Sequence, residues 1–286
     1  MQSIADILDA ARTGDLEPCA GCPWSPKAEE SVGFGVSCRD HGIDWARDGR
    51  AVSMIVVQDP GDTTPHETGR LCAVHNAENP TDRTAQQSLR LWNAAVSLRT
   101  GDPQHGGYLR GHYWTNSIMH GASDSTGLRE RRIMETARTH CTKVLEAQLR
   151  ALRPKIVIAS GAEAAKSLKS IGVMSAAWWR ARREFPNGAY SEVNDRWLPD
   201  GTIRVFCTYH TAGGVVNRTV ASAYEDSPSE PVIARKALAL GNPGSVDEFL
   251  STYSSLSSSL DKGMRYLLNH WLDIGLAIRE AHESAI

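Results

Sequence analysis

Two cysteines near the amino terminus have the spacing of a metal-binding pair. Cys19-Ala-Gly-Cys22 is a C-x-x-C motif, and this spacing lets two thiolates turn toward one soft metal centre. Pro23 and Trp24 follow directly and would stiffen and cover the turn. The alternative is a pair of buried thiols, because free cysteine is among the most buried residue types. The remaining cysteines are Cys38, Cys72, Cys141 and Cys207.

Polar residues that could do chemistry stand at the ends of apolar segments. Each such segment is short and rich in β-branched or aromatic residues, as a buried strand would be. In α/β folds the chemistry takes place at the carboxyl ends of the strands. The candidates are Gln58 and Asp59 after residues 51–57, Asn116 at or near the carboxyl end of the strand expected at residues 113–119, and His210 after residues 203–209.

The elements that must position these residues alternate between strands and helices, which predicts an α/β domain with a parallel sheet. The strands are expected at residues 51–57, 113–119, 155–160 and 203–209. Helical spacing of apolar residues predicts helices at 2–12, 84–98, 131–152 and 162–170. The segment 175–200 is aromatic, basic and turn-rich, and no strand is assigned to it.

The carboxyl-terminal part predicts a helical appendage. Apolar residues recur at helical spacing from 246 to 284, and the serine-rich stretch 251–259 is expected to break the pattern. We therefore divide the chain into an α/β domain with an amino-terminal metal-binding loop at 1–230 and a helical extension at 231–286.

Composition narrows the class of protein. The chain has 286 residues, of which 41% are hydrophobic and 22% charged, and these values exclude collagenous, coiled-coil and wholly disordered chains. A net charge of −2 leaves any nucleic-acid binding to local basic clusters. No apolar run approaches the ~20 residues that cross a bilayer, and the first residues do not read as a secretory signal. We expect a cytoplasmic protein with reduced thiols and no membrane contact.

The order of the motifs resembles the uracil-DNA glycosylase superfamily, and within it the iron-sulfur members. Those proteins carry C-x-x-C, a G-E-A-P-G type strand end, T-N-x-x-K-C, a helix that opens with Cys, P-x-x-I-x-x-L-G and H-P. Residues 15–220 contain the corresponding stretches. They are Cys19-Ala-Gly-Cys22, Val57-Gln-Asp-Pro-Gly61, Thr115-Asn-Ser-Ile-Met-His120, Cys141, Pro154-Lys-Ile-Val-Ile-Ala-Ser-Gly161 and Tyr209-His210. The resemblance implies a three-layer α/β/α fold with a central four-stranded parallel sheet.

It also implies a monofunctional DNA glycosylase, a hydrolase that flips a pyrimidine out of DNA and leaves an abasic site. In that reaction Asp59 would orient the water and offset the positive charge on the sugar, with Gln58 assisting, and His210 would donate to the departing base. Without the resemblance, Asp59 is an ordinary turn residue and His210 a structural one.

Asn116 offers the carboxamide needed to read a pyrimidine edge, with Leu71 on the wall of the pocket. The loop after His210 would approach the DNA. Its glycines would let the backbone come near a phosphate, an apolar side chain would enter the base stack, and an arginine would contact a phosphate. A flexible surface loop is the alternative. The loop residues are Gly213, Gly214, Val215 and Arg218.

The resemblance assigns the metal centre four ligands, with His120 standing where the family has its third cluster cysteine. They are Cys19, Cys22, His120 and Cys141. Three thiolates and an imidazole suit a 4Fe-4S cluster or a structural Zn. Cys38 is the rival for the fourth position, and the metal would fasten the amino-terminal loop to the sheet.

The substrate is expected to be uracil or a larger pyrimidine. The family places an aromatic residue after Gly69 to stack on the base, but residues 61–91 contain no aromatic residue. A wider pocket would suit a 5-substituted, even glucosylated, cytosine, a base that some superfamily members excise in phage defence. The alternatives are a catalytically silent DNA- or nucleotide-binding module and a zinc hydrolase unrelated to DNA. We expect a monomer with no obligate protein partner.

Overall fold

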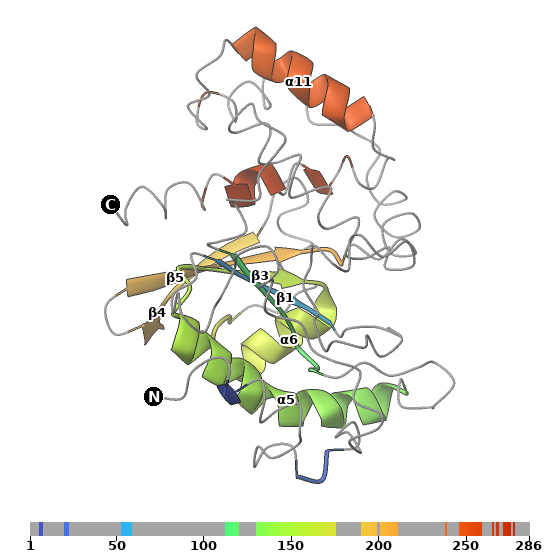
Figure 1. Cartoon of the computed structure of the whole chain (residues 1–286), viewed down its shortest axis with the longest axis vertical. Helices are drawn as coiled ribbons and strands as arrows, with labels where there is room; N and C mark the ends of the chain where they lie inside the picture. The colour runs from blue at the N-terminus through green and yellow to red at the C-terminus, as the bar shows by residue number, and fades with distance from the viewer. Residues whose placement is uncertain are drawn as a thin grey trace.

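The central element is a sheet whose described strands have the order β2-β1-β3-β5-β4 (Figure 1). This computed structural model describes residues 6–7, 20–22, 53–58, 112–119, 130–175, 190–198, 201–210, 238, 246–258, 265, 267–268, 271–275 and 277. The strands are β1 (Ser53–Val57), β2 (His112–Asn116), β3 (Ile156–Ser160), β4 (Tyr190–Leu198) and β5 (Gly201–Thr208).

Strands β2, β1, β3 and β5 are parallel to one another, which confirms the predicted four-stranded parallel sheet. All five residues of β3 are buried, as expected for a parallel strand that is covered on both faces. Asn116 is the last residue of β2, so the prediction that it lies at a strand end is also confirmed.

The prediction is incomplete in segment 175–200, because β4 lies there. This strand pairs antiparallel with β5 at the edge of the sheet, with Tyr190 opposite Cys207 and Leu198 opposite Gly201. Its sequence, YSEVNDRWL, has several charged and polar residues and lacks the apolar run that marks the central strands. An edge strand has a neighbour on one side only, so its sequence need not resemble that of a buried central strand.

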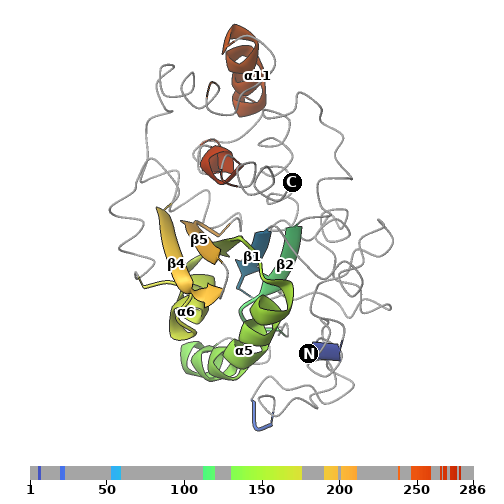
Figure 2. The same ribbon diagram turned by 90° about the vertical axis from the view of Figure 1, so that its left-hand side faces the viewer.

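Two helices cover one face of the sheet. Helix α5 (Arg131–Leu152) joins β2 to β3, and α6 (Ala162–Ser170) follows β3, with the bounds that the sequence predicts. Both connections run in the same direction across the sheet, and right-handed crossovers then place both helices on the same face, as Figure 2 shows. Of the predicted helix 2–12 the structure describes residues 6–7, which are helical, and the predicted helix 84–98 lies outside the described residues.

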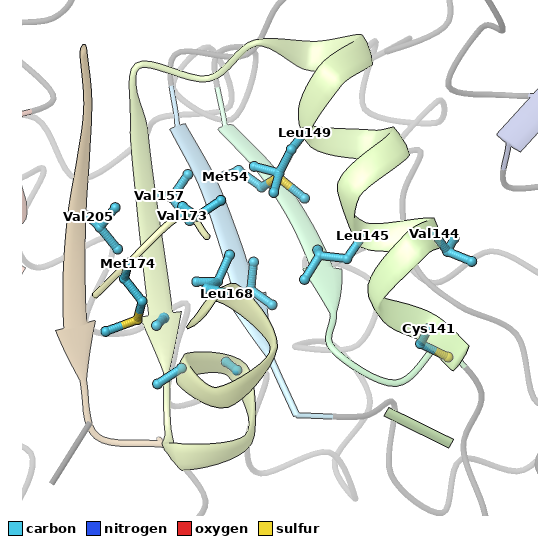
Figure 3. Packing of buried hydrophobic residues seen from close by; sticks show 14 of the residues in the cluster. Met54, Cys141, Val144, Leu145, Leu149, Val157, Leu168, Val173, Met174 and Val205 are labelled. Atoms are coloured by element: carbon cyan, nitrogen blue, oxygen red, sulfur yellow. The ribbon is translucent and has the colours of Figure 1, made fainter. Parts of the chain in front are cut away.

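The core lies between these helices and the sheet (Figure 3). Alternate residues of β1, such as Met54 and Val56, face the buried stripe of α5. That stripe recurs every three or four residues, as a helix packed on a sheet requires. It consists of Ala137, Cys141, Val144, Leu145, Gln148, Leu149 and Leu152.

Helical residues from the carboxyl-terminal part lie on the other side of the sheet in both views (Figures 1 and 2). Helix α11 (Val246–Ser258) continues through the serine-rich stretch, so the predicted break there is wrong. Phe249 and Tyr253 are buried four residues apart, and the Thr252 and Ser258 hydroxyls donate to carbonyls of the preceding turn. The proposed boundary at residue 230 stays a prediction. No helix within the described ranges combines the length and apolar character needed to cross a membrane.

Candidate active site

The parallel register brings three of the predicted site residues to one edge of the sheet, the edge formed by the carboxyl ends of the parallel strands. Asn116 ends β2 directly opposite Val57, the last residue of β1, and Gln58 follows. His210 stands two residues beyond the end of β5. Since β1 and β5 are two strand spacings apart, about 10 Å, a single small molecule can span this edge.

This edge contains the topological switch point of the sheet. The chain leaves β1 in one direction to form β2 and then crosses back over β1 to form β3. In open α/β sheets of this topology, ligands bind at the carboxyl ends of the two strands that flank the switch point, which here are β1 and β3. Gln58 and Gly161 follow those two strands, so they flank the position where open α/β sheets bind ligands.

Hydrogen bonds hold the turn after β2 against the residue that precedes Asp59. The Ser117 and Ile118 amides donate to the carbonyls of Val57 and Gln58 at 2.8 and 2.9 Å. The Ser117 hydroxyl also donates to the Gln58 carbonyl, at 2.7 Å. Two donors on one carbonyl fix the backbone of Gln58. Asp59 itself lies outside the described residues.

The Asn116 side chain presents a buried acceptor. The residue is 6% exposed, and its Oδ1 has no hydrogen-bond partner among the residues that the structure describes. Leaving a buried polar atom unpaired costs about 1–3 kcal/mol, and buried amide oxygens are almost always bonded. An acceptor of this kind at the carboxyl ends of the strands could accept a hydrogen bond from a ligand with an N–H or O–H donor.

Gly161 determines how closely His210 approaches the sheet. Its amide donates to the Thr208 carbonyl at 2.8 Å, and its backbone has φ 94° and ψ 173°, a combination that essentially only glycine adopts. A Cβ at this position would lie 3.0 Å from His210 Cβ and 3.4 Å from Cδ2. The half-buried His210 therefore packs on the bare backbone at the start of α6, a role for Gly161 that the sequence motif marked only as a strand end.

The described part of the metal motif places Cys141 beside the turn that leads to position 120. The Met119 amide donates to the buried Cys141 Sγ at 3.4 Å, and His120 is the next residue in the sequence. Cys22 packs against the same core cluster as Cys141. Hydrogen bonds to ligand sulfurs are typical of iron-sulfur sites, so these residues fit the predicted centre. The described residues alone include no group of three or more His, Cys, Asp or Glu that could hold a metal ion.

Several of the predicted site residues lie outside the described residues, and their roles stay predictions. They are Asp59, Leu71, Gly213, Gly214, Val215 and Arg218 of the active site, and Cys19, Cys38 and His120 of the metal centre.

Comparison with known proteins agrees with this arrangement. Residues 46–227 match the family model described as the Uracil DNA glycosylase superfamily. No curated protein matches the chain. The matched segment is more than half of the chain and includes the four parallel strands, α5, α6 and the ligand-binding edge of the sheet. With its parallel sheet, its switch point and this match in agreement, the chain belongs to the uracil DNA glycosylase superfamily.

Proposed function

We propose that this protein is a monofunctional DNA glycosylase that flips a pyrimidine out of DNA and hydrolyses its N-glycosidic bond, leaving an abasic site. Proteins of the uracil DNA glycosylase superfamily are DNA glycosylases. Membership therefore makes DNA the partner and hydrolysis the reaction class, and the proposal adds the kind of base and the roles of individual residues.

The buried Asn116 carboxamide is the observation that carries the proposal. Its unpaired Oδ1 can accept from the ring N–H of uracil or the exocyclic amine of cytosine, while its Nδ2 can donate to a neighbouring carbonyl or ring nitrogen. Glycosylases read a flipped base by such hydrogen bonds to its Watson–Crick edge. A pyrimidine bound here would satisfy the acceptor that the described protein groups leave open.

The neighbouring residues supply the chemistry that the reaction needs. Cleavage passes through an oxocarbenium-like sugar, which a carboxylate stabilises while it positions water. Asp59 directly follows Gln58, whose backbone is anchored to the turn after β2. His210, packed on Gly161 at the same edge, would donate to the base as negative charge develops on it.

The proposed substrate rests on the sequence of residues 61–91, which contains no aromatic residue. A pocket with Leu71 on its wall in place of an aromatic residue would accept a pyrimidine enlarged at its 5-position better than plain uracil, because apolar walls discriminate mainly by bulk. Hydroxymethylated and glucosylated cytosines are bases of this kind. A cytoplasmic enzyme that removes them would act in phage defence, whereas an enzyme for uracil would act in base-excision repair.

The second part of the proposal concerns the metal centre. Cys19, Cys22, His120 and Cys141 would hold a 4Fe-4S cluster, with Zn as the alternative. The buried Cys141 thiol and its hydrogen bond from the Met119 amide support this assignment. Such a centre would supply a structural cross-link between the amino-terminal loop and Cys141 in the middle of α5.

A base-release assay tests the proposed activity. The substrates are matched single- and double-stranded oligonucleotides that carry uracil, 5-hydroxymethylcytosine or its glucosylated form, and base release is measured under single-turnover conditions. We expect the enlarged bases to be released faster than uracil. For a monofunctional enzyme we also expect the DNA strand to stay intact and borohydride to trap no covalent adduct between enzyme and DNA. Binding without release of any base would favour the catalytically silent module, and no binding would favour the unrelated zinc hydrolase.

Asparagine variants supply the matched control. Asn116→Ala should reduce base release by about tenfold or more, because it removes the pairing with the base edge. Asn194→Ala changes the same residue type in the same sheet, but on β4 opposite Ile203, and should release the base at the wild-type rate. Equal effects of the two changes would contradict the role of Asn116.

A further inference from the structure

A buried polar network ties β2 to α5 next to the strand end that carries Asn116. Gln148 is fully buried within the apolar stripe of α5. The hydroxyls of Tyr113 and Thr115 both donate to its Oε1, each at 2.8 Å. Its Nε2 donates to the Met119 sulfur at 3.4 Å. One side chain on α5 therefore holds β2 at two positions and also holds the turn that follows it.

The network has a defined polarity. Burial raises the pKa of the Tyr113 phenol well above its usual value of 10.0, an effect that the Thr115 hydroxyl partly offsets. The phenol therefore stays protonated and donates. With two donors on Oε1, the Gln148 amide can adopt only the orientation that directs its Nε2 toward Met119.

Hydrogen bonds fix the residues on both sides of Asn116 in the sequence. Thr115, which precedes it, is held by Gln148, and Ser117, which follows it, is held by the carbonyls of Val57 and Gln58. Successive side chains of a strand point to opposite faces. Fixing Thr115 toward α5 therefore sets the direction in which the Asn116 carboxamide leaves the backbone.

An apolar side chain would fill the place of Gln148 without this directional control. Satisfied buried polar networks specify one arrangement of a core, whereas apolar packing tolerates several. We propose that Gln148 is a positioning residue for base recognition, which acts through Thr115 and Met119 to hold the Asn116 carboxamide in its base-reading orientation. The inference rests on the role of Asn116 in the proposed function.

The direct test observes the Asn116 side chain without requiring activity. In protein labelled with 15N-asparagine, the Asn116 side-chain amide signals are assigned by their loss in Asn116→Asp. We expect one sharp pair in the wild type, and shifted, broadened or doubled signals in Gln148→Leu. Val144→Ala truncates a buried residue one turn earlier on α5 and should leave these signals unchanged.

A triple variant separates positioning from stability. Gln148→Leu alone removes the Oε1 acceptor of two buried hydroxyls. Gln148→Leu with Tyr113→Phe and Thr115→Val removes the two donors as well, which can be nearly neutral for stability. We expect the triple variant to recover most of the lost urea midpoint but not the sharp Asn116 signals. Wild-type signals in the triple variant would overturn the proposal and leave Gln148 a purely structural residue.

A double-mutant cycle provides the functional readout. Gln148→Leu should slow base release by about tenfold in the wild type, and should have little further effect in the Asn116→Ala background. Equal effects in both backgrounds would show that Gln148 does not act through Asn116. If the wild type releases no base while the amide signals respond as expected, the proposed function fails and the positioning role stands.

Discussion

Replacing Gly161 by alanine tests how the fold positions His210. The added Cβ would lie 3.0 Å from His210 Cβ, which is tighter than nine in ten Cβ contacts in proteins. The contact is with the first side-chain atom of His210, which cannot move unless the backbone moves with it. Residue 210 must therefore shift by a few tenths of an ångström, away from the start of α6.

The backbone of residue 161 sets the cost in stability. Its φ of 94° and ψ of 173° fall in a region that is essentially reserved for glycine, and a residue held there costs about 1–3 kcal/mol. If His210 is the donor to the departing base, as we propose, its displacement adds a loss of activity, because moving a donor out of line lowers the rate by roughly tenfold or more. Gly161→Ala should therefore be both less stable and slower.

Urea unfolding and single-turnover base release measure the two effects separately. Gly172→Ala is the matched control, because Gly172 also has a positive φ, 76°, but lies after α6, at the opposite end of that helix. It should lose about 1 kcal/mol and release the base at the wild-type rate. If Gly161→Ala keeps full activity, or if Gly172→Ala slows release equally, the contact between Gly161 and His210 does not position the imidazole.

The remaining predictions concern the buried phenol, the carboxylate and the metal centre. Because the folded-state pKa of Tyr113 is raised above 10.0, its contribution to stability is complete below pH 10 and is lost as the pH rises toward the folded pKa. Relative to Tyr113→Phe, the wild type should lose up to about 1.4 kcal/mol per pH unit above pH 10 in urea unfolding, and parallel curves would contradict this. Asp59→Asn should lower base release by a factor on the order of 10² with DNA binding nearly unchanged, whereas wild-type turnover would remove Asp59 from the mechanism. Cys141→Ser should yield insoluble or metal-free protein by iron and zinc analysis, and His120→Cys should retain the metal. Zinc without iron in anaerobically purified protein would exclude the iron-sulfur cluster. If Cys38→Ser loses the metal and His120→Ala retains it, the fourth ligand is Cys38 and not His120.

The amino-acid sequence by itself determined the central strands and the two helices that pack on them. These elements are recognisable because burial imposes a pattern on neighbouring residues. A short apolar run marks β3, which is covered on both faces, and regular spacing marks the stripe of α5. Placing polar residues at the strand ends then located Gln58, Asn116 and His210 at one edge, since parallel strands share their direction.

The sequence did not predict the correct secondary structure where the local pattern of residues and the tertiary environment disagree. The antiparallel β4 has a largely polar sequence because it pairs on one side only, although the Pro-Asp-Gly turn signal after Leu198 hints at a hairpin. In α11 the serines favoured a break, but the buried Phe249 and Tyr253 keep the helix intact. In both cases the outcome depends on which side of the element other parts of the chain cover.

The contacts that refine the site were decided only by the tertiary structure. Gln148 could be noticed as a polar residue within an apolar stripe, but its partners on β2 are 33 and 35 residues away in the sequence. The same holds for Gly161 against His210 and for the Met119 amide on Cys141. Residue types and spacing indicate which groups can react, whereas distances between groups far apart in the sequence arise only when the sheet and its helices pack together.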